Sequence, residues 1–339
     1  MEGTAYVPMV QRAWELFRKL EADAGVSLLR SIGNLTIGPP DGTAVSGFLR
    51  SAETYDIAHE LLTASEVRRR WPALVCPDEF VAGLETEAGI LDPERAVEVM
   101  LAEAASAGAD VRSGDPVSAV RCDGGGVVVD AASGRFHADV AVVATGARPL
   151  AIPRHVQPKR VPVVWFLPED SAPFEYGAFP VNFWQLPPRT ATGAESSIEH
   201  AAAVGADEPW EVYSLPVIEP GGGVKVAAHN RLADCDPDSD PEDVTETEIA
   251  TLRRFVRAFI PRLADAPIRS QRCFYADTLD GEFVLGSAPD AECIFVAACA
   301  GHGFKFAPAL GEILADLATG RTPAYDISRF SPREREIER

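Results

Sequence analysis

The sequence HADVAVVATGA at residues 137–147 decides the fold class, because it reads as one buried strand that ends in a glycine turn. We predict this strand over residues 136–145. Upstream, Asp92 and Pro93 suit an N-cap and a first helical position, and Gly108 can close a helix of about four turns. Short strands are expected between the helix and the buried strand, at 110–112, 117–121 and 126–130. The order helix, strand, meander and buried strand predicts an α/β domain.

The flanking segments add further elements. Apolar residues recur at helical spacing near the start of the chain and predict an amphipathic helix: Val7, Val10, Trp14, Phe17 and Leu20. Residues 29–37 read as a strand that a Gly-Pro-Pro sequence stops. The sequence TASE at 63–66 has the form of a capping box and predicts a short helix that ends near Trp71.

Residues 151–225 have a different pattern, rich in aromatic residues and proline, as in VVWFLPE, FPVNFWQL and WEVYSLPVI. This pattern predicts a second domain built on an antiparallel sheet. A polar segment at 188–209 interrupts the strands and is expected to form a surface loop or a short helix.

The rest of the chain returns to alternating helices and strands. Helical spacing at 249–259 predicts a helix that Pro261 ends. The last unit reads as a strand at 293–299, a glycine turn, and a helix at 308–318 with Gly320 as its C-cap. We therefore expect a mixed α/β (α+β) protein.

Composition excludes several classes of partner. The chain has 339 residues, long enough for two closely joined domains. Its net charge is −20, from 51 acidic and 31 basic residues, so no nucleic acid partner is expected. No apolar stretch approaches the roughly 18 residues of a membrane span. No signal peptide is visible, so we expect a cytoplasmic protein without membrane contact.

Cysteine and lysine usage narrows the chemistry. The six cysteines show neither a CxxC pair nor the spacing of zinc ligands, so we expect free thiols and no metal site. Lysine is rare: only Lys19, Lys159, Lys225 and Lys305 occur among the 31 basic residues. Arginine cannot replace lysine where a compact point charge is needed. Lys225 and Lys305 lie in the apolar, glycine-rich segments GGGVKVAAH and GHGFKF, which favours a functional role for both.

Several motifs in a fixed order carry a family resemblance. They are CFYADTLDGEFVLG at 273–286, FVAACAGHGFKFAP at 295–308 and DISRFS at 326–331, with AYVP at 5–8, RWP at 70–72, GIL at 89–91 and ATGA at 144–147. Together they resemble the FAD-dependent amine oxidases of the monomeric sarcosine oxidase and N-methyltryptophan oxidase family, within the D-amino acid oxidase-like superfamily. The resemblance covers the chain apart from the segment at 188–209.

The resemblance implies a glutathione-reductase-type FAD-binding domain joined to an antiparallel-sheet substrate domain. The FAD-binding domain would comprise residues 1–30, 86–150 and 270–339, and the substrate domain residues 31–85 and 151–269. The dinucleotide motif G-x-G-x-x-G is absent from the sequence, so the FAD-binding domain is expected to lack its first βαβ unit.

Three explanations for this missing unit stay open. They are a start codon assigned too late, a gene that is a remnant, and a separate chain that supplies the nucleotide-binding half. A parallel sheet without its first strands is expected to expose apolar surface and unpaired edges. The matching functions are a working oxidase in its complete form, or else a non-catalytic relic or a subunit of a split flavoenzyme.

The resemblance also implies a covalent flavin. Cys273 matches the cysteine that carries FAD through a thioether to its 8α carbon, and the neighbouring Arg272 is expected to lower the pKa of the thiol. The flavin ring edge would be wrapped by Gly301, His302, Gly303, Phe304 and Lys305, ahead of the positive end of a helix. Val117 would contact the adenine through its backbone.

Four residues match catalytic positions of the family. Lys305 matches the lysine that holds the substrate carboxylate, and Lys225 the lysine that helps oxygen accept an electron. His229 and Tyr213 match residues that line the substrate site. Alternation along a strand would place Lys225, Ala227 and His229 on one face.

The implied enzyme is an oxidoreductase that acts on CH–NH donors with oxygen as the acceptor. A secondary amine such as an N-methyl amino acid passes a hydride equivalent to the flavin, the imine is hydrolysed, and oxygen becomes hydrogen peroxide. Sarcosine, N-methyltryptophan, pipecolate and sugar-amine oxidases share these motifs, so the amine stays open. A dehydrogenase or demethylase that avoids oxygen is an alternative that Lys225 disfavours.

Overall fold

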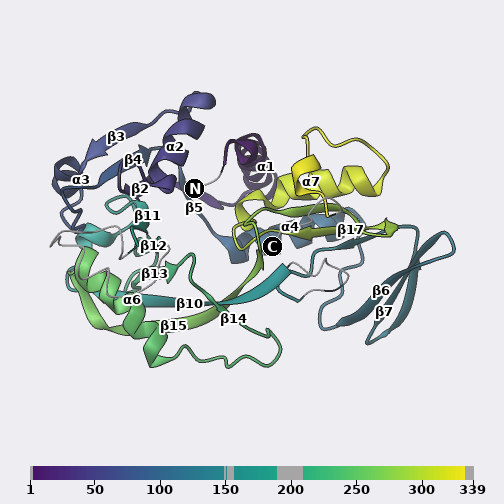
Figure 1. Cartoon of the computed structure of the whole chain (residues 1–339). Coiled ribbons are helices and arrows are strands. Elements are labelled where there is room, and N and C mark those ends of the chain that lie inside the picture. The colour runs from purple at the N-terminus through teal and green to yellow at the C-terminus, as the bar shows by residue number, and fades with distance from the viewer. Residues whose placement is uncertain (1–2, 149, 151–155, 189–208, 333–339) are drawn as a thin grey trace.

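The computed structural model describes residues 3–148, 150, 156–188 and 209–332 (Figure 1). Its α-helices are α1 (Val7–Ala24), α2 (Thr43–Thr54), α3 (Ala64–Arg70), α4 (Pro93–Ser106), α6 (Glu246–Phe259) and α7 (Ala307–Ala318). Four 3-10 turns occur among the described residues: η1 (Thr4–Tyr6), η2 (Ala172–Phe174), η4 (Phe304–Phe306) and η5 (Ser328–Phe330). The strands are β1 (Leu29–Ser31), β2 (Asn34–Gly38), β3 (Glu60–Thr63), β4 (Val81–Glu85), β5 (Gly89–Leu91), β6 (Val117–Asp123), β7 (Gly126–Ala131), β8 (Gly134–Ala138), β9 (Ala141–Val143), β10 (Val156–Pro168), β11 (Val181–Leu186), β12 (Trp210–Leu215), β13 (Val224–Ala228), β14 (Ala233–Asp234), β15 (Leu263–Thr278), β16 (Val284–Ala288) and β17 (Ala291–Ala298).

The largest sheet has nine strands and is mostly antiparallel. Its order is β14-β10-β13-β12-β11-β2-β4-β3, and β15 pairs with β10. Strands β2 and β11 run parallel, while the other neighbouring pairs run antiparallel. The antiparallel sheet predicted from the aromatic segments is therefore confirmed.

Helix α6 covers one face of this sheet. Thr245 and Glu248 form a capping box that begins the helix. Phe255 and Phe259 are buried on its inner side and pack on Trp184. Their ring centroids lie 5.9 Å and 4.9 Å, respectively, from that of Trp184. Burying one such phenylalanine ring stabilises the fold by about 1.5–3 kcal/mol of transfer free energy. The predicted helix is confirmed, and its apolar side fixes which face of the sheet is covered.

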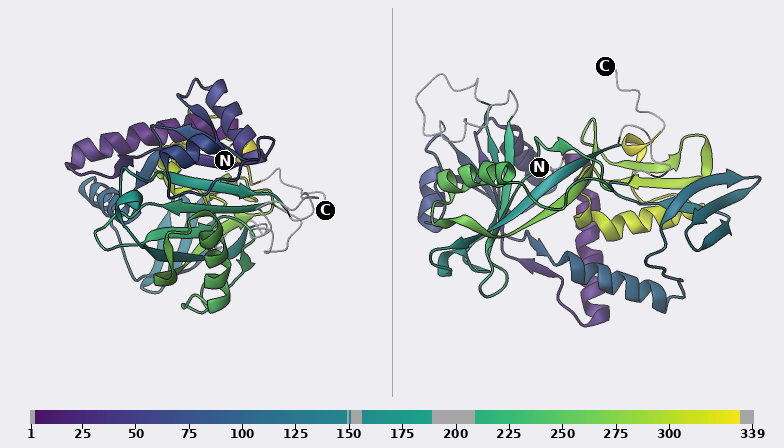
Figure 2. Two further views of the ribbon diagram at one scale, coloured as in Figure 1. Left: turned by 90° about the vertical axis from the view of Figure 1, so that its left-hand side faces the viewer. Right: turned by 90° about the horizontal axis from the view of Figure 1, so that it is seen from below.

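Helices α1, α4 and α7 gather in the other half of the molecule, away from α6 (Figures 1 and 2). Phe17 of α1, Ala96 of α4 and Leu28, which precedes β1, form one buried cluster. Helix α4 begins as predicted, because the Asp92 side chain accepts a hydrogen bond from the Arg95 amide and Pro93 stands in the first turn. Beside these helices lies the sheet β16-β17-β9.

Strands β10 and β15 connect the two halves. Their antiparallel register extends from Val156 opposite Thr278 to Pro168 opposite Leu263. Figure 2 shows this long pair crossing the molecule, so side chains on β15 lie at the junction of the two halves.

Residues 136–145 do not form the single buried strand that we predicted. Their first part belongs to β8, which pairs with β7 in the meander β6-β7-β8. Their second part is β9, which pairs in parallel with β17 at the edge of its sheet, and Val142 is 44% exposed. An apolar run specifies a strand but not the number of its neighbours, and that is why the prediction is wrong.

Two other predicted strands also differ. Residues 29–37 divide into β1 and β2, in separate sheets, because Gly33 with φ of 79° turns the chain between them. Residues 110–112 form no strand; they are exposed, and the Arg112 guanidinium binds the Asp110 carboxylate instead.

The expectation of free thiols is wrong for two cysteines. Cys122 on β6 and Cys293 on β17 form a disulfide. They are 171 residues apart in the sequence, so spacing could not reveal the pair. Four cysteines are free: Cys76, Cys235, Cys273 and Cys299.

The polar segment at 188–209 lies outside the described residues except for its two end residues. Within the described ranges, no helix has the length and apolar character needed to cross a membrane. In the same ranges, no group of three or more His, Cys, Asp or Glu side chains could hold a metal ion.

Candidate active site

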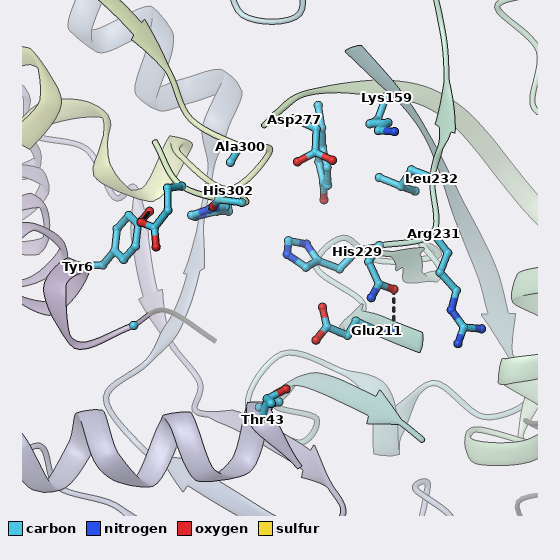
Figure 3. A pocket seen from close by; sticks show the side chains of 16 residues that line it. Tyr6, Thr43, Lys159, Glu211, His229, Arg231, Leu232, Asp277, Ala300 and His302 are labelled. Carbon is cyan, nitrogen blue, oxygen red and sulfur yellow. Dashed lines mark hydrogen bonds between the residues drawn. The ribbon is translucent and has the colours of Figure 1, made fainter. Parts of the chain in front are cut away.

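Two adjoining cavities lie where the nine-stranded sheet faces α1 and the turn at Gly301. Their volumes are about 620 Å³ and about 490 Å³, within the range of small-molecule sites. His229, Tyr275 and His302 line both cavities. Figure 3 shows the larger one, with His229 and His302 among its lining residues.

Strand β13 places its side chains alternately on the two faces of the sheet. Val226 belongs to the core under α6, whereas Ala227 belongs to a cluster on the opposite face. The predicted alternation is confirmed, and it places Lys225 on the face of Ala227. His229 follows the strand, and its ring centroid lies 5.8 Å from that of Tyr275.

Lys225 and Cys273 are electrostatic neighbours on this face. Burial lowers the pKa of Lys225, and the Cys273 thiolate opposes that change. Burial raises the pKa of the Cys273 thiol, and the Lys225 charge is the largest opposing effect. The Lys225 ammonium also lies 5.7 Å from the ring centroid of Trp165. Lys225 on β13 and Cys273 on β15 are thus half-buried groups whose charges affect each other.

The prediction that Arg272 lowers the pKa of the thiol is wrong. The Arg272 guanidinium stacks 4.6 Å from the ring centroid of Phe274 and donates a hydrogen bond to the Asp240 carbonyl. Successive residues of a strand point to opposite faces, so adjacency in sequence keeps Arg272 and Cys273 apart.

Two half-buried tyrosines lie in the same cluster as Cys273. Tyr213 on β12 and Tyr275 on β15 interact through their hydroxyl groups. Burial raises the pKa of Tyr213 to about 12 and raises the pKa of Tyr275 as well. Both phenols are therefore protonated at neutral pH and can hydrogen-bond a ligand. Sequence reasoning missed Tyr275, although it stands two residues after Cys273 on one strand face.

The turn at Gly301 requires its glycines for packing. Gly301 has φ of 77°, and a Cβ there would lie 2.3 Å from the Tyr275 ring. A Cβ on Gly303 would lie 2.1 Å from Cβ of Cys299. The close approach of Gly301 places the turn against the Tyr275 ring on β15.

Lys305 follows the turn and lines the smaller cavity. Its Nζ donates a hydrogen bond to the His302 carbonyl at 3.1 Å and lies 5.3 Å from the ring centroid of Phe306. These contacts hold the ammonium group near the start of α7, at the wall opposite Tyr213.

Two predicted cofactor residues lie away from the cavities. Phe304 is 39% exposed and lines neither cavity. Val117 begins β6, is 41% exposed and also lines neither. Of the other predicted residues, the structure places Tyr213, His229, Gly301, His302 and Lys305 on the cavities, whereas Lys225, Cys273 and Gly303 line neither.

The motifs that carry the family resemblance meet in one aromatic cluster. Tyr6, Phe283, Phe306 and Phe330 are buried together, one from each of four motifs. The Tyr6 hydroxyl donates to Glu282 at 2.6 Å and accepts from the Phe283 amide at 3.2 Å. The His302 ring packs on Phe283 with centroids 4.9 Å apart. Much of the motif pattern therefore specifies packing beneath the Gly301 turn.

The donor set of the cleft fits the ring end of a flavin. A thiol and an ammonium group share one face, and a glycine turn that admits close backbone approach lies opposite. The two cavities between these walls have the volume of a cofactor and small substrate site.

The match to a family sequence model defines the class of this protein, a flavin-dependent oxidoreductase. The chain belongs to the FAD dependent oxidoreductase family, whose sequence model matches residues 2–317.

Individual relatives agree with this assignment. The chain is 32% identical to a monomeric sarcosine oxidase of Streptomyces avermitilis, over 98% of this chain and 83% of that protein. It is 28% identical to an N-methyl-L-tryptophan oxidase of Salmonella agona, over 97% of this chain and 83% of that protein.

Solved structures with the same fold confirm the predicted fold class. The amino acid oxidase NikD superposes with a TM-score of 0.78 at 23% identity, over 98% of this chain and 84% of that chain. Glycine oxidase from Geobacillus kaustophilus superposes with a TM-score of 0.76 at 19% identity, over the same shares of the two chains.

Proposed function

We propose that this protein is an FAD-dependent oxidase of secondary amines, with N-methyl amino acids as substrates and oxygen as the electron acceptor. The observation that supports it most is the sheet face that carries Cys273 with Tyr213 and Tyr275, on which the charge of Lys225 acts on the Cys273 thiol. The sarcosine and N-methyltryptophan oxidases among the relatives support the same chemistry.

Cys273 would hold the cofactor through a thioether, and the turn at Gly301 would lie along the edge of the ring. Bound FAD supplies a two-electron acceptor that passes its electrons on to oxygen. Lys225 holds a positive charge on the same face, where developing negative charge on oxygen needs a preorganised cation. Partial burial lowers the local dielectric, so the charge of Lys225 acts more strongly than it would in bulk water.

The substrate would be oriented by groups on both walls. Lys305 would pair with the carboxylate of the amino acid, as a point charge in a mostly apolar cavity. The hydroxyls of Tyr213 and Tyr275 and the ring of His229 would hydrogen-bond the amine end. In the net reaction a secondary amine, water and oxygen give a primary amine, an aldehyde and hydrogen peroxide.

A second candidate function is a subunit that another polypeptide segment completes. The outer edge of β9 favours it: within the described residues β9 pairs with β17 alone, and Val142 is 44% exposed. Such an edge is stabilised when a further strand pairs with it.

Flavin retention in denatured protein tests the proposal. We would express this chain, and in parallel a version extended by any upstream reading frame, and measure flavin fluorescence after acid precipitation. We expect attached flavin that Cys273→Ser abolishes and the matched control Cys235→Ser retains. Peroxide production from sarcosine or N-methyltryptophan would then follow.

The outcomes separate the candidates. Attached flavin with peroxide production in either version supports the oxidase. Attached flavin with substrate reduction but no peroxide indicates a dehydrogenase. Soluble protein without flavin in both versions overturns the oxidase assignment and favours the incomplete subunit.

A further inference from the structure

The larger cavity has an acidic wall that the family motifs do not mark. Glu211 on β12 lines it, two residues before Tyr213 on the same strand face. Asp277 on β15 lines it as well, two residues after Tyr275. Each carboxylate therefore lies two residues from a tyrosine of its own strand, Tyr213 or Tyr275, on the side away from Lys225.

Glu211 is held in place by a buried amide. Gln185, 3% exposed, donates from its Nε2 to the Glu211 carboxylate at 2.9 Å and to the Thr43 hydroxyl at 2.7 Å. Its Oε1 accepts from the Ala44 amide, at the start of α2, at 3.0 Å. The Glu211 backbone amide also donates to Asn230 at 2.9 Å. This network fixes the carboxylate before any ligand arrives, and the fixed geometry favours recognition.

No basic side chain within the described ranges forms an ion pair with Glu211. Lys159 pairs with Asp234, and Lys159 and His302 also act on Asp277, whereas neither of them is among the groups that shift the pKa of Glu211. Burial raises the pKa of Glu211 and of Asp277. Desolvated carboxylates are stabilised by a cation within a few ångströms.

Lys305 and the Glu211 carboxylate lie in different cavities, and the smaller cavity is also lined by Glu85. Lys305 lies in the smaller cavity, and Glu211 and Asp277 lie in the larger one. Tyr275 and His229 line both, so one extended ligand could contact both ends. Such a ligand needs a carboxylate at one end and a positive charge at the other.

We propose that the larger cavity is a recognition subsite for a cationic side chain, and that the preferred substrates are N-alkylated basic amino acids. The proposal rests on the proposed function and deepens it. The carboxylate would bind Lys305, the secondary amine would lie beside Tyr213 and Tyr275, and the side-chain ammonium would pair with Glu211.

Binding of L-lysine and L-norleucine to the flavin-containing protein tests the subsite, because they differ only by the ammonium group and neither is a secondary amine. By calorimetry we expect L-lysine to bind about tenfold more tightly, as for a hydrogen bond between charged groups. Glu211→Gln should reduce this ratio toward one. Glu219→Gln, at an exposed position outside both cavities, is the matched control and should leave the ratio unchanged.

Oxidation of Nα-methyl-L-lysine and Nα-methyl-L-norleucine is measured in parallel. Equal binding of lysine and norleucine overturns the subsite, whether or not either methylated compound is oxidised. Selective, Glu211-dependent binding of lysine without oxidation leaves the subsite standing and overturns the oxidase. If Glu211→Gln does not fold, the ratio of lysine to norleucine binding is measured in Asp277→Asn and in the unaltered protein instead. A ratio of one in the unaltered protein overturns the proposal.

Discussion

At the scale of single residues, Gly301 lets its turn pack directly against the Tyr275 ring. Replacing it by alanine would place a Cβ 2.3 Å from the Tyr275 ring at φ of 77°. We expect Gly301→Ala to lower the free energy of unfolding by about 2–4 kcal/mol, from backbone strain and displacement of the ring. Urea denaturation measures this change in the free energy of unfolding.

The matched control for this change is Gly311→Ala in α7. A Cβ at Gly311 meets nothing within 4 Å, so alanine should raise the free energy of unfolding by about 0.5–1 kcal/mol. Equal effects of the two substitutions would contradict the contact between Gly301 and Tyr275.

Lys225 should control the reactivity of the Cys273 thiol. Its charge is the largest effect that opposes the rise in the pKa of Cys273. In Lys225→Met the pKa of the thiol rises further, so a smaller fraction is thiolate at pH 8.5. We expect alkylation of Cys273 by iodoacetamide, in protein prepared without flavin, to slow about threefold to tenfold. Mass spectrometry of the Cys273 peptide measures the rate.

Cys235 serves as the internal control for that experiment, because Lys225 is not among the charges that shift its pKa. Its alkylation rate should stay unchanged in Lys225→Met. A rate at Cys273 that is also unchanged would mean that the two side chains are not electrostatic neighbours.

At the scale of elements, the disulfide between Cys122 and Cys293 ties the meander to β17. Because it closes a long segment of chain, we expect Cys122→Ser to lower the free energy of unfolding by about 2–4 kcal/mol. Thermal unfolding with and without a reductant measures the effect. Reduction should bring the unaltered protein to the stability of Cys122→Ser, and Cys235→Ser should change neither value.

At the scale of the whole molecule, the core divides into separate clusters. Phe174 belongs to the cluster beneath α6, and Phe283 to the aromatic cluster around Tyr6. Both side chains are at most 1% exposed, so each change to alanine should cost about 3–5 kcal/mol. We expect Phe283→Ala to raise amide exchange mainly in α7, and Phe174→Ala to raise it mainly in α6.

Hydrogen exchange followed by peptide mass spectrometry resolves the two regions. If both substitutions raise exchange equally in α6 and α7, the two clusters unfold as one cooperative unit. Selective effects would support two units joined by the β10–β15 pair.

Local signals in the sequence determined much of the molecule. The Thr63 capping box, the Asp92 N-cap and the apolar spacing of α1 act within a few residues, so the helices that we predicted from them are confirmed. Alternation likewise placed Lys225 and Ala227 on one face, because the period of a strand is local. The motifs indicated the family for the same reason: their residues and order can be read directly.

Only the tertiary structure decided which distant residues meet. It paired Cys122 with Cys293, placed β9 at the edge of its sheet, and turned Arg272 away from Cys273. It also set Glu211 and Gln185 at one end of the cavities, across from Lys305. Contacts between residues far apart in the chain depend on strand order and register, which no local pattern specifies.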